Sequence, residues 1–248
     1  TLYLGDQLFP FTAELLRTLH DQGKKYLFMT NNSSKSVADY IKKWEKLGIQ
    51  ASEDDFITSS QATAYYLKKH HAGDAIYVMG TRSLKEALKQ QGFDIRDTYA
   101  EDITCALIGF DTELTFQKLT DMSRLLLRDI PYIATNPDWV CPTEFGYVPD
   151  CGSMSEMLCH ATGKKPLFIG KPSPLMPRLA MDRWGYQPEE TLVIGDRIYT
   201  DIKSGVSAGT NTALVLSGET TPEILAQSDT KPTVVYRDCG EMLTLLKK

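Results

Sequence analysis

Three short polar segments carry the residue types that phosphate chemistry requires. Residues 195–201 (GDRIYTD) hold Asp196 and Asp201 about one helical turn apart, directly after an apolar run. Two carboxylates this close repel each other unless a cation lies between them or hydrogen-bond donors satisfy them. Mg²⁺ takes oxygen ligands of this kind. The segment therefore predicts either a magnesium site or two acids that favour the start of a helix.

The other two segments are residues 30–34 (TNNSS) and residues 170–174 (GKPSP). Thr30, Asn31 and Asn32 could hold phosphate oxygens together with the free N–H groups of a following helix. They could also do no more than cap that helix. Lys171 could neutralise phosphoryl charge, or it could be an exposed lysine in a turn. Each segment taken alone leaves both interpretations open.

Alternating apolar and amphipathic runs must position these segments. Strands are expected over 25–29, 75–79, 105–108, 167–169, 191–194 and 212–216, and helices over 11–22, 34–47, 83–91, 115–129, 174–184 and 199–208, with a short β-α pair at the end. Such alternation predicts parallel sheets that are covered by helices on both faces. Each polar segment follows a predicted strand, and the carboxyl ends of parallel strands are where such sheets carry their active sites.

Two changes in composition, near 70–74 and 162–166, predict domain boundaries. Residues 73–164 then form a second α/β domain, which is inserted into a domain made of residues 1–72 and 165–248.

Charge and composition exclude several classes of partner. The net charge is −5 and the basic residues are scattered, which argues against a nucleic acid polymer as partner. No apolar run reaches the ~18 residues of a membrane span, and no signal peptide is visible. Five cysteines without a C-x-x-C spacing and four histidines without zinc-site spacing predict reduced thiols in a cytoplasmic protein. A monomer and a homo-oligomer both remain open.

The order of the polar segments is more specific than any one of them. A threonine, then a lysine, then a paired-aspartate loop resembles motifs two, three and four of the haloacid dehalogenase superfamily. Residues 134–138 (ATNPD) narrow the resemblance to its NagD-like, or p-nitrophenyl phosphatase, branch within subfamily IIA. The resemblance covers essentially the whole chain. It implies a Rossmann-like, doubly wound parallel sheet as the core, with an inserted α/β cap of the C2 type.

This resemblance also implies an activity. Members hydrolyse small phosphate monoesters with Mg²⁺ through an aspartyl-phosphate intermediate. Asp196 would bind the Mg²⁺, and Asp201 would hold the metal's water shell or orient Lys171. Thr30 and Asn31, with Asn32 beside them, would donate to the phosphoryl group.

The resemblance extends to contacts with the substrate. Arg197 stands where many relatives have Asn, and it is a further candidate for binding the substrate. In the cap, the loop with Asn136, Asp138 and Trp139 is the candidate for recognising the leaving group of the substrate. Trp139 could stack on a ring, or it could lie in the core of the cap.

The first family motif reads Asp-x-Asp-Gly-Thr, and Thr1 resembles its threonine. The two catalytic aspartates would then lie four and two positions before Thr1. We expect them to precede residue 1, because the residues before that threonine form the central strand of the family's sheet. The alternative is a catalytically inactive protein of the same fold that binds phosphate ligands or regulates. The mass of the intact natural protein distinguishes the two interpretations.

Overall fold

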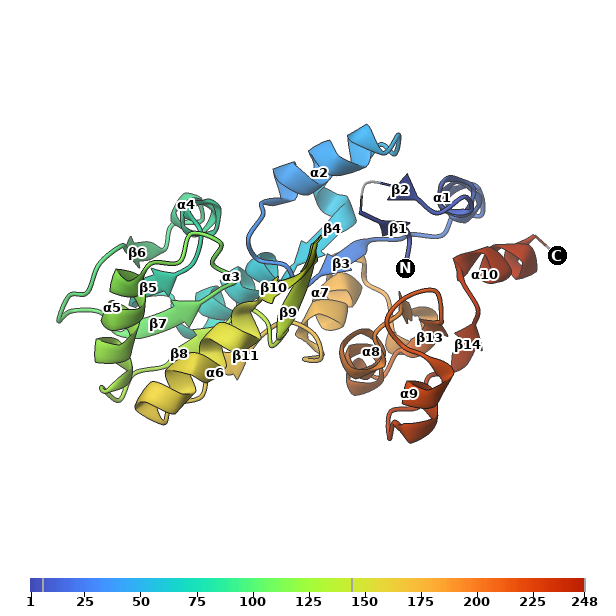
Figure 1. The fold of residues 1–248 in the computed structure, drawn as a ribbon. Coiled ribbons are helices and arrows are strands. Elements are labelled where there is room, and N and C mark those ends of the chain that lie inside the picture. Colours follow the sequence, from blue (N-terminus) through green and yellow to red (C-terminus); the bar gives the residue numbers. More distant parts are fainter. Residues whose placement is uncertain (6, 144, 248) are drawn as a thin grey trace. The chain divides into compact units, whose positions relative to one another are not determined.

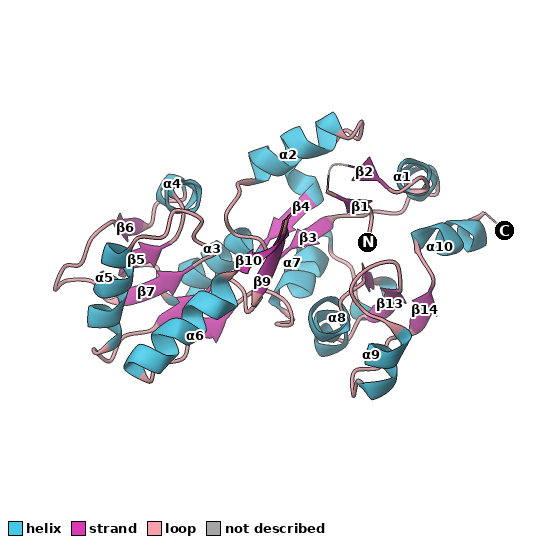
Figure 2. Ribbon diagram, viewed as in Figure 1, coloured by secondary structure: helices cyan, strands magenta, loops and turns pink. Residues whose placement is uncertain are grey.

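Strands and helices alternate along the chain, as Figure 2 shows. The computed structural model describes residues 1–5, 7–143 and 145–247. The chain divides into two units: unit 1 comprises Thr1–Phe28, Ile41–Ile57 and Lys171–Lys248, and unit 2 comprises Met29–Tyr40 and Thr58–Gly170. Unit 2 therefore contains the segment 73–164 that was predicted as an insertion, together with residues 29–40, 58–72 and 165–170.

Unit 2 is built around a five-stranded parallel sheet. The strand order is β11-β8-β7-β5-β6, with β5 (Ala75–Met79), β6 (Asp94–Arg96), β7 (Cys105–Ile108), β8 (Tyr132–Ala134) and β11 (Leu167–Phe168). The central strands are apolar runs that are buried on both faces, as a parallel sheet covered by helices requires.

Four helices of unit 2 alternate with these strands along the chain: α3 (Ser59–His70), α4 (Arg82–Gln90), α5 (Phe116–Leu126) and α6 (Cys151–Thr162). Figure 1 shows α5 and α6 side by side over the same strands, and both contribute buried side chains to one apolar cluster with β5, β7 and β8. An antiparallel hairpin of β9 (Val140–Thr143) and β10 (Gly146–Pro149) precedes α6.

Unit 1 contains a three-stranded parallel sheet in the order β12-β13-β14. The strands of this sheet are β12 (Leu192–Gly195), β13 (Asn211–Val215) and β14 (Val234–Tyr236). Near residue 1, unit 1 also contains a hairpin of β1 (Tyr3–Leu4) and β2 (Gln7–Leu8). Its helices are α1 (Thr12–Asp21), α7 (Leu175–Trp184), α8 (Lys203–Ala208), α9 (Pro222–Gln227) and α10 (Cys239–Leu246). The helices α1 and α10 pack together through Leu15, Met242 and Leu243.

The boundary between the units falls within three elements: β3 (Phe28–Thr30), its partner strand β4 (Phe56–Thr58), and α2 (Val37–Lys46). The two larger sheets are wholly parallel and alternate with helices, which confirms the predicted α/β class. None of the helices among the described residues has the length and apolar character that crossing a membrane would require.

The structure corrects some of the predicted elements. Helix α3 was not predicted, and the predicted helix over 199–208 begins instead as a π-helical turn, Ile198–Ile202, before α8. This turn carries Asp201, and π-helical turns are frequent at functional sites.

Candidate active site

Asp196 lies directly after β12, at the carboxyl end of a parallel strand. Its Oδ1 accepts a hydrogen bond from the Thr1 hydroxyl and lies 3.0 Å from the Thr1 amino nitrogen. Its Oδ2 accepts from the N–H of Glu219 at 3.2 Å. Burial raises the pKa of Asp196, whereas hydrogen bonds from the Thr1 hydroxyl and the Glu219 amide lower it. Both oxygens of this carboxylate are therefore held by neighbouring groups.

Two glycines make room for the carboxylates. A Cβ atom on Gly218 would lie 2.2 Å from Oδ2 of Asp196, and a Cβ atom on Gly195 would lie 2.2 Å from the Cβ of Asp201. Real Cβ atoms do not approach other atoms so closely. Any larger residue at either position would displace a carboxylate from the strand ends.

Lys171 and Asp201 form a short, largely buried ion pair. The Lys171 Nζ lies 2.6 Å from Oδ1 of Asp201, and the two side chains are only 10% and 13% exposed. The other oxygen, Oδ2, accepts from the N–H of Arg197 at 3.1 Å. Because each oxygen of Asp201 has a donor, this carboxylate fixes the position of the Lys171 ammonium. Of the two roles that the resemblance implied for Asp201, this geometry supports the orientation of Lys171.

Arg197 is itself paired with an acid. Its Nε lies 2.6 Å from Oε2 of Glu219, and the Tyr199 hydroxyl donates to Oε1 of the same carboxylate. The Glu219 side chain therefore holds two residues of the loop, while its backbone N–H holds Asp196.

Residues 218–220, which we call the clamp, hold the loop that carries Asp196. Thr220 makes two of the contacts. Its N–H donates to the carbonyl of Asp196 at 3.0 Å, and its Oγ1 accepts from the N–H of Ile198 at 3.0 Å. None of the three polar segments that drew attention in the sequence includes the clamp. A signal was present, because a polar segment follows β13, and neighbouring parallel strands end at the same edge of a sheet.

The residues predicted after β3 form a compact local turn in unit 2. The Oγ1 of Thr30 accepts from the N–H of Asn32 at 3.2 Å, and the Oδ1 of Asn32 accepts from the N–H and hydroxyl of Ser34 at 2.9 and 2.7 Å. Asn31 is buried, and its carbonyl accepts from the Ser59 hydroxyl at 2.6 Å. The oxygen of the Asn32 side chain thus stabilises the turn, whereas the phosphate contacts of Thr30 and Asn31 stay predictions.

Asn136 and Asp138 lie in a buried network of unit 2. The Nδ2 of Asn136 donates to Oδ2 of Asp138 at 3.2 Å and to Oδ1 of Asp150 at 3.0 Å, and its Oδ1 accepts from the Thr135 hydroxyl at 2.8 Å. Asp150 also accepts from the N–H of Cys151 at the start of α6. The Asn136 amide therefore ties the loop before β9 to the first turn of α6.

Trp139 lies on the surface, with 60% of the residue exposed. The interpretation that places it in the core of the cap is therefore wrong. Its carbonyl accepts from the N–H of Asp150 at 3.0 Å and from the Ser153 hydroxyl at 2.5 Å. The backbone is held while the residue as a whole stays largely exposed.

The structure brings together four predicted residues in unit 1, namely Lys171, Asp196, Arg197 and Asp201. The predicted residues of unit 2 form two groups, the turn with Thr30, Asn31 and Asn32 and the network that precedes Trp139. For a divalent cation, the donor set around Asp196 is suitable, because an ionised carboxylate at a strand end is a hard oxygen ligand of the type that Mg²⁺ and Ca²⁺ prefer.

Family models match both ends of the chain. The model described as haloacid dehalogenase-like hydrolase matches residues 1–94, and a second, described as HAD-hydrolase-like, matches residues 168–242. An acid sugar phosphatase of Staphylococcus haemolyticus is 31% identical over 100% of this chain and 94% of its own length. A 5′-nucleotidase of Bacillus subtilis is 34% identical over 94% of this chain and 90% of its own length.

Solved structures agree with this similarity. A 4-nitrophenylphosphatase from Thermotoga maritima superposes with a TM-score of 0.92 at 38% identity, over 98% of this chain and 93% of that one. NagD from Escherichia coli K-12 gives a TM-score of 0.88 at 29% identity, over 97% and 94% of the two chains. A glycerol phosphate phosphatase from Mycobacterium tuberculosis, solved in complex with calcium, gives 0.90 at 27% identity, over 99% and 71%.

Proposed function

The chain belongs to the haloacid dehalogenase-like hydrolases, in their NagD-like branch, and is a phosphoric monoester hydrolase; from this premise we propose that it is a Mg²⁺-dependent phosphatase that works through an aspartyl phosphate. The observation that carries the proposal is the pairing of Lys171 with Asp201 at 2.6 Å in the unit that also holds the carboxylate of Asp196 at the end of β12. A fixed cation and an oxygen ligand for a divalent ion are the parts that phosphoryl transfer requires.

Asp196 would hold the divalent ion, with Mg²⁺ as the physiological metal. When it is bound, this ion supplies positive charge that screens the approach of an anionic nucleophile to the phosphate. The hydrogen bonds of Asp196 with the clamp at residues 218–220 would fix the carboxylate before the ion arrives.

Lys171 would neutralise the charge on the phosphoryl oxygens in the transition state. Its ammonium is held by Asp201, so little reorganisation is needed during the reaction. Thr30 and Asn31 would donate hydrogen bonds to the phosphoryl group. Arg197 would act mainly through its ion pair with Glu219, as part of the loop that carries Asp196.

The attacking carboxylate would come from the first family motif, of which Thr1 would be the threonine. Its oxygen would form the bond to phosphorus while the ester P–O bond breaks, and the second aspartate of the motif would protonate the leaving oxygen. The same aspartate would then take a proton from the water that hydrolyses the aspartyl phosphate.

The substrate would be a small phosphate monoester, such as a sugar phosphate or a nucleotide. The names of the relatives, an acid sugar phosphatase and a 5′-nucleotidase, support this class. In unit 2, Asn136 and Asp138 would act by fixing the loop, and the exposed Trp139 would contact the leaving group. A cytoplasmic location agrees with such metabolites.

Metal dependence is the experiment that tests the proposal. The full-length natural protein is dialysed against EDTA and assayed with 4-nitrophenyl phosphate and a panel of sugar phosphates and nucleotides. We expect activity to disappear with EDTA and to return with Mg²⁺. Full activity without any divalent ion would contradict the proposal.

A substitution then connects this dependence to the loop. Asp196→Asn should lower kcat/KM by roughly 10³-fold, because metal-assisted charge stabilisation contributes several kcal/mol to phosphoryl transfer. The exposed acid Asp182 in unit 1 provides a matched control, and Asp182→Asn should leave kcat/KM unchanged. Turnover near the wild-type level in Asp196→Asn would refute the role of Asp196 as metal ligand.

A further inference from the structure

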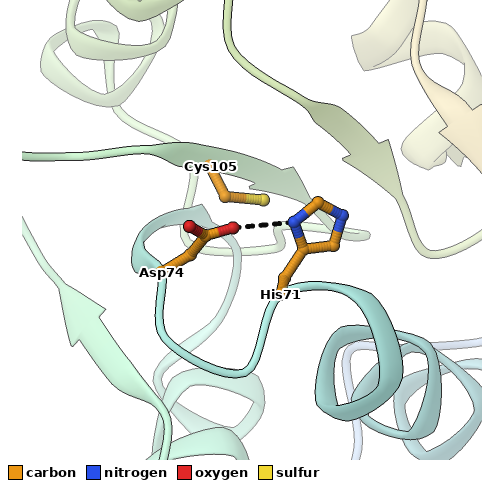
Figure 3. Close-up of side chains that lie close together, drawn as sticks. All are labelled: His71, Asp74 and Cys105. Carbon is orange, nitrogen blue, oxygen red and sulfur yellow. Dashed lines mark hydrogen bonds and ion pairs between the residues drawn. The ribbon is translucent and has the colours of Figure 1, made fainter.

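Three side chains of different chemistry meet in unit 2, at the edge of the sheet where the strands begin. Figure 3 shows His71, Asp74 and Cys105 close together. His71 follows α3, Asp74 immediately precedes β5, and Cys105 is the first residue of β7, the neighbour of β5. This is the amino-terminal edge of the parallel sheet. Phosphatase chemistry is expected at the carboxyl ends of strands, so the cluster belongs to none of the candidate sites described above.

The ligand atoms of the three residues converge. The Nδ1 of His71 lies 2.7 Å from Oδ2 of Asp74, and one ligand atom from each residue lies within 4.8 Å of the others. In Figure 3 the sulfur of Cys105 points toward the space between the carboxylate and the imidazole ring. The second oxygen of Asp74, Oδ1, accepts from the Thr104 hydroxyl at 2.9 Å. Because Asp74 is anchored by Thr104, its Oδ2 is directed at the cluster.

We propose that His71, Asp74 and Cys105 form a binding site for a transition-metal ion of the zinc type, with water in the fourth position. Nitrogen, sulfur and carboxylate oxygen are the ligands that Zn²⁺ uses, and three protein ligands plus water make a tetrahedral site. A thiol and an imidazole do not suit Mg²⁺, which prefers oxygen ligands. The cluster therefore selects a different metal from the carboxylate of Asp196.

Admitting the ion requires the pair of His71 and Asp74 to open. With Zn–N and Zn–O bonds of about 2.0 Å in a tetrahedral arrangement, the nitrogen and oxygen ligands lie roughly 3.3 Å apart. The distance from the Nδ1 of His71 to the Oδ2 of Asp74 is 2.7 Å, and it would have to increase to roughly that value. The side chains of His71 and Asp74 are 12% and 29% exposed, so an ion can enter from their side.

Catalysis by a Cys-His-Asp group does not fit the same residues. Cys105 has no exposed surface, so its sulfur cannot reach a substrate molecule. A metal ligand has no such need, because the ion comes to the sulfur. Bound metal would join the end of α3 to the starts of β5 and β7, and by mass action it would stabilise unit 2.

A cobalt titration tests the site directly. Co²⁺ is added to the metal-free, full-length protein in the presence of excess Mg²⁺, and the near-ultraviolet absorption is recorded. We expect a thiolate-to-cobalt charge-transfer band that saturates at one equivalent and disappears on addition of Zn²⁺. The oxygen ligands at Asp196 cannot produce this band, so the readout is independent of the phosphatase proposal.

Substitutions identify the ligands. Cys105→Ser should abolish the band, and His71→Gln should weaken Co²⁺ binding by at least tenfold. The partly exposed Cys159 serves as control, and Cys159→Ser should keep the band. Because Cys105 is buried, each variant is first compared with the wild type by circular dichroism and metal-free Tm, and His71→Gln carries the test if Cys105→Ser fails to fold.

Two results would overturn the site. One is the absence of a charge-transfer band in the wild type at stoichiometric Co²⁺, which would leave the pair of His71 and Asp74 as a stabiliser of the turn between α3 and β5. The other is wild-type Co²⁺ affinity in His71→Gln.

Discussion

In unit 1 the carboxylate of Asp196 accepts from the Thr1 hydroxyl and the Glu219 N–H, and the carboxylate of Asp201 pairs with the Lys171 ammonium. In unit 2 the carboxylates of Asp138 and Asp150 share one neutral donor, the amide of Asn136. Both clusters lie beside the carboxyl ends of parallel strands, and both are largely buried. They use the same type of acid for different purposes.

The two clusters differ in the groups that contact their carboxylates. A carboxylate at a strand end is an oxygen ligand that suits a divalent ion, and a carboxylate that pairs with an ammonium fixes the position of a lysine. A carboxylate bound by a buried amide is suited to fixing a loop, because its hydrogen bonds are expensive to replace. We therefore assign chemistry to the cluster in unit 1 and support of the Trp139 loop to the cluster in unit 2.

The largest effect on turnover among the following variants should come from Lys171→Ala. Removing one preorganised charge donor from a transition state typically lowers kcat by about 10²–10³-fold. The measurement is steady-state kinetics with saturating Mg²⁺. Lys203 is an exposed lysine at the start of α8, and Lys203→Ala should leave kcat unchanged. An unchanged kcat in Lys171→Ala would mean that Lys171 is only a turn lysine.

Glu219→Gln should have a smaller effect, and it should act on the metal. The substitution removes the charge that pairs with Arg197 but retains the backbone N–H that holds Asp196. Loss of a residue that orients a ligand typically weakens metal affinity by about 10–100-fold, and we expect the lower end here. The concentration of Mg²⁺ that gives half-maximal activity measures this affinity.

The exposed acid Glu223 provides the control for that experiment, with Glu223→Gln expected to match the wild type. Equal Mg²⁺ affinity in Glu219→Gln and the wild type would reduce the pair of Arg197 and Glu219 to an ordinary ion pair near the surface.

Asn136→Ala should lower stability. It leaves two buried carboxylates without their shared donor, at a cost of about 1–3 kcal/mol in the free energy of unfolding. Urea denaturation gives this quantity. Asn211→Ala removes a single exposed hydrogen bond and should cost less than about 0.5 kcal/mol. If both variants were equally stable, the network would not be the support that we describe.

Trp139→Ala should have the smallest effect, confined to substrate recognition. Loss of one aromatic contact costs about 0.5–1.5 kcal/mol, so KM for nucleotides and aryl phosphates should rise roughly twofold to tenfold. KM for phosphates without a ring, kcat and Tm should not change. Phe116→Ala, at another exposed aromatic residue of unit 2, is the control. A rise in KM for every substrate alike would argue against stacking.

Much of the fold is visible in the sequence because buried parallel strands are apolar runs. The strands predicted over 75–79 and 105–108 coincide with β5 and β7. Helix α3 was missed although its signal is present: Thr58 and Gln61 form a capping box at its start. The π-helical turn at Ile198–Ile202 has no comparable signature, since it depends on how the chain after β12 packs.

The residues of the candidate sites also divide into those that the sequence predicts and those that it does not. Lys171, Asp196 and Asp201 were predicted from their order after strands, and their order is a local property of the sequence. Glu219 was missed because it is linked to Asp196 across 23 residues, through the pairing of β12 with β13. The cluster of His71, Asp74 and Cys105 was missed for a similar reason, because β5 and β7 bring its members together.

We infer that Asp196 of unit 1, and no carboxylate of unit 2, holds the metal ion. Isothermal titration of Mg²⁺ into the wild type, Asp196→Asn and Asp138→Asn tests it most directly. We predict one site in the wild type, no measurable site in Asp196→Asn, and wild-type affinity in Asp138→Asn. Retained binding in Asp196→Asn, or its loss in Asp138→Asn, would contradict the account.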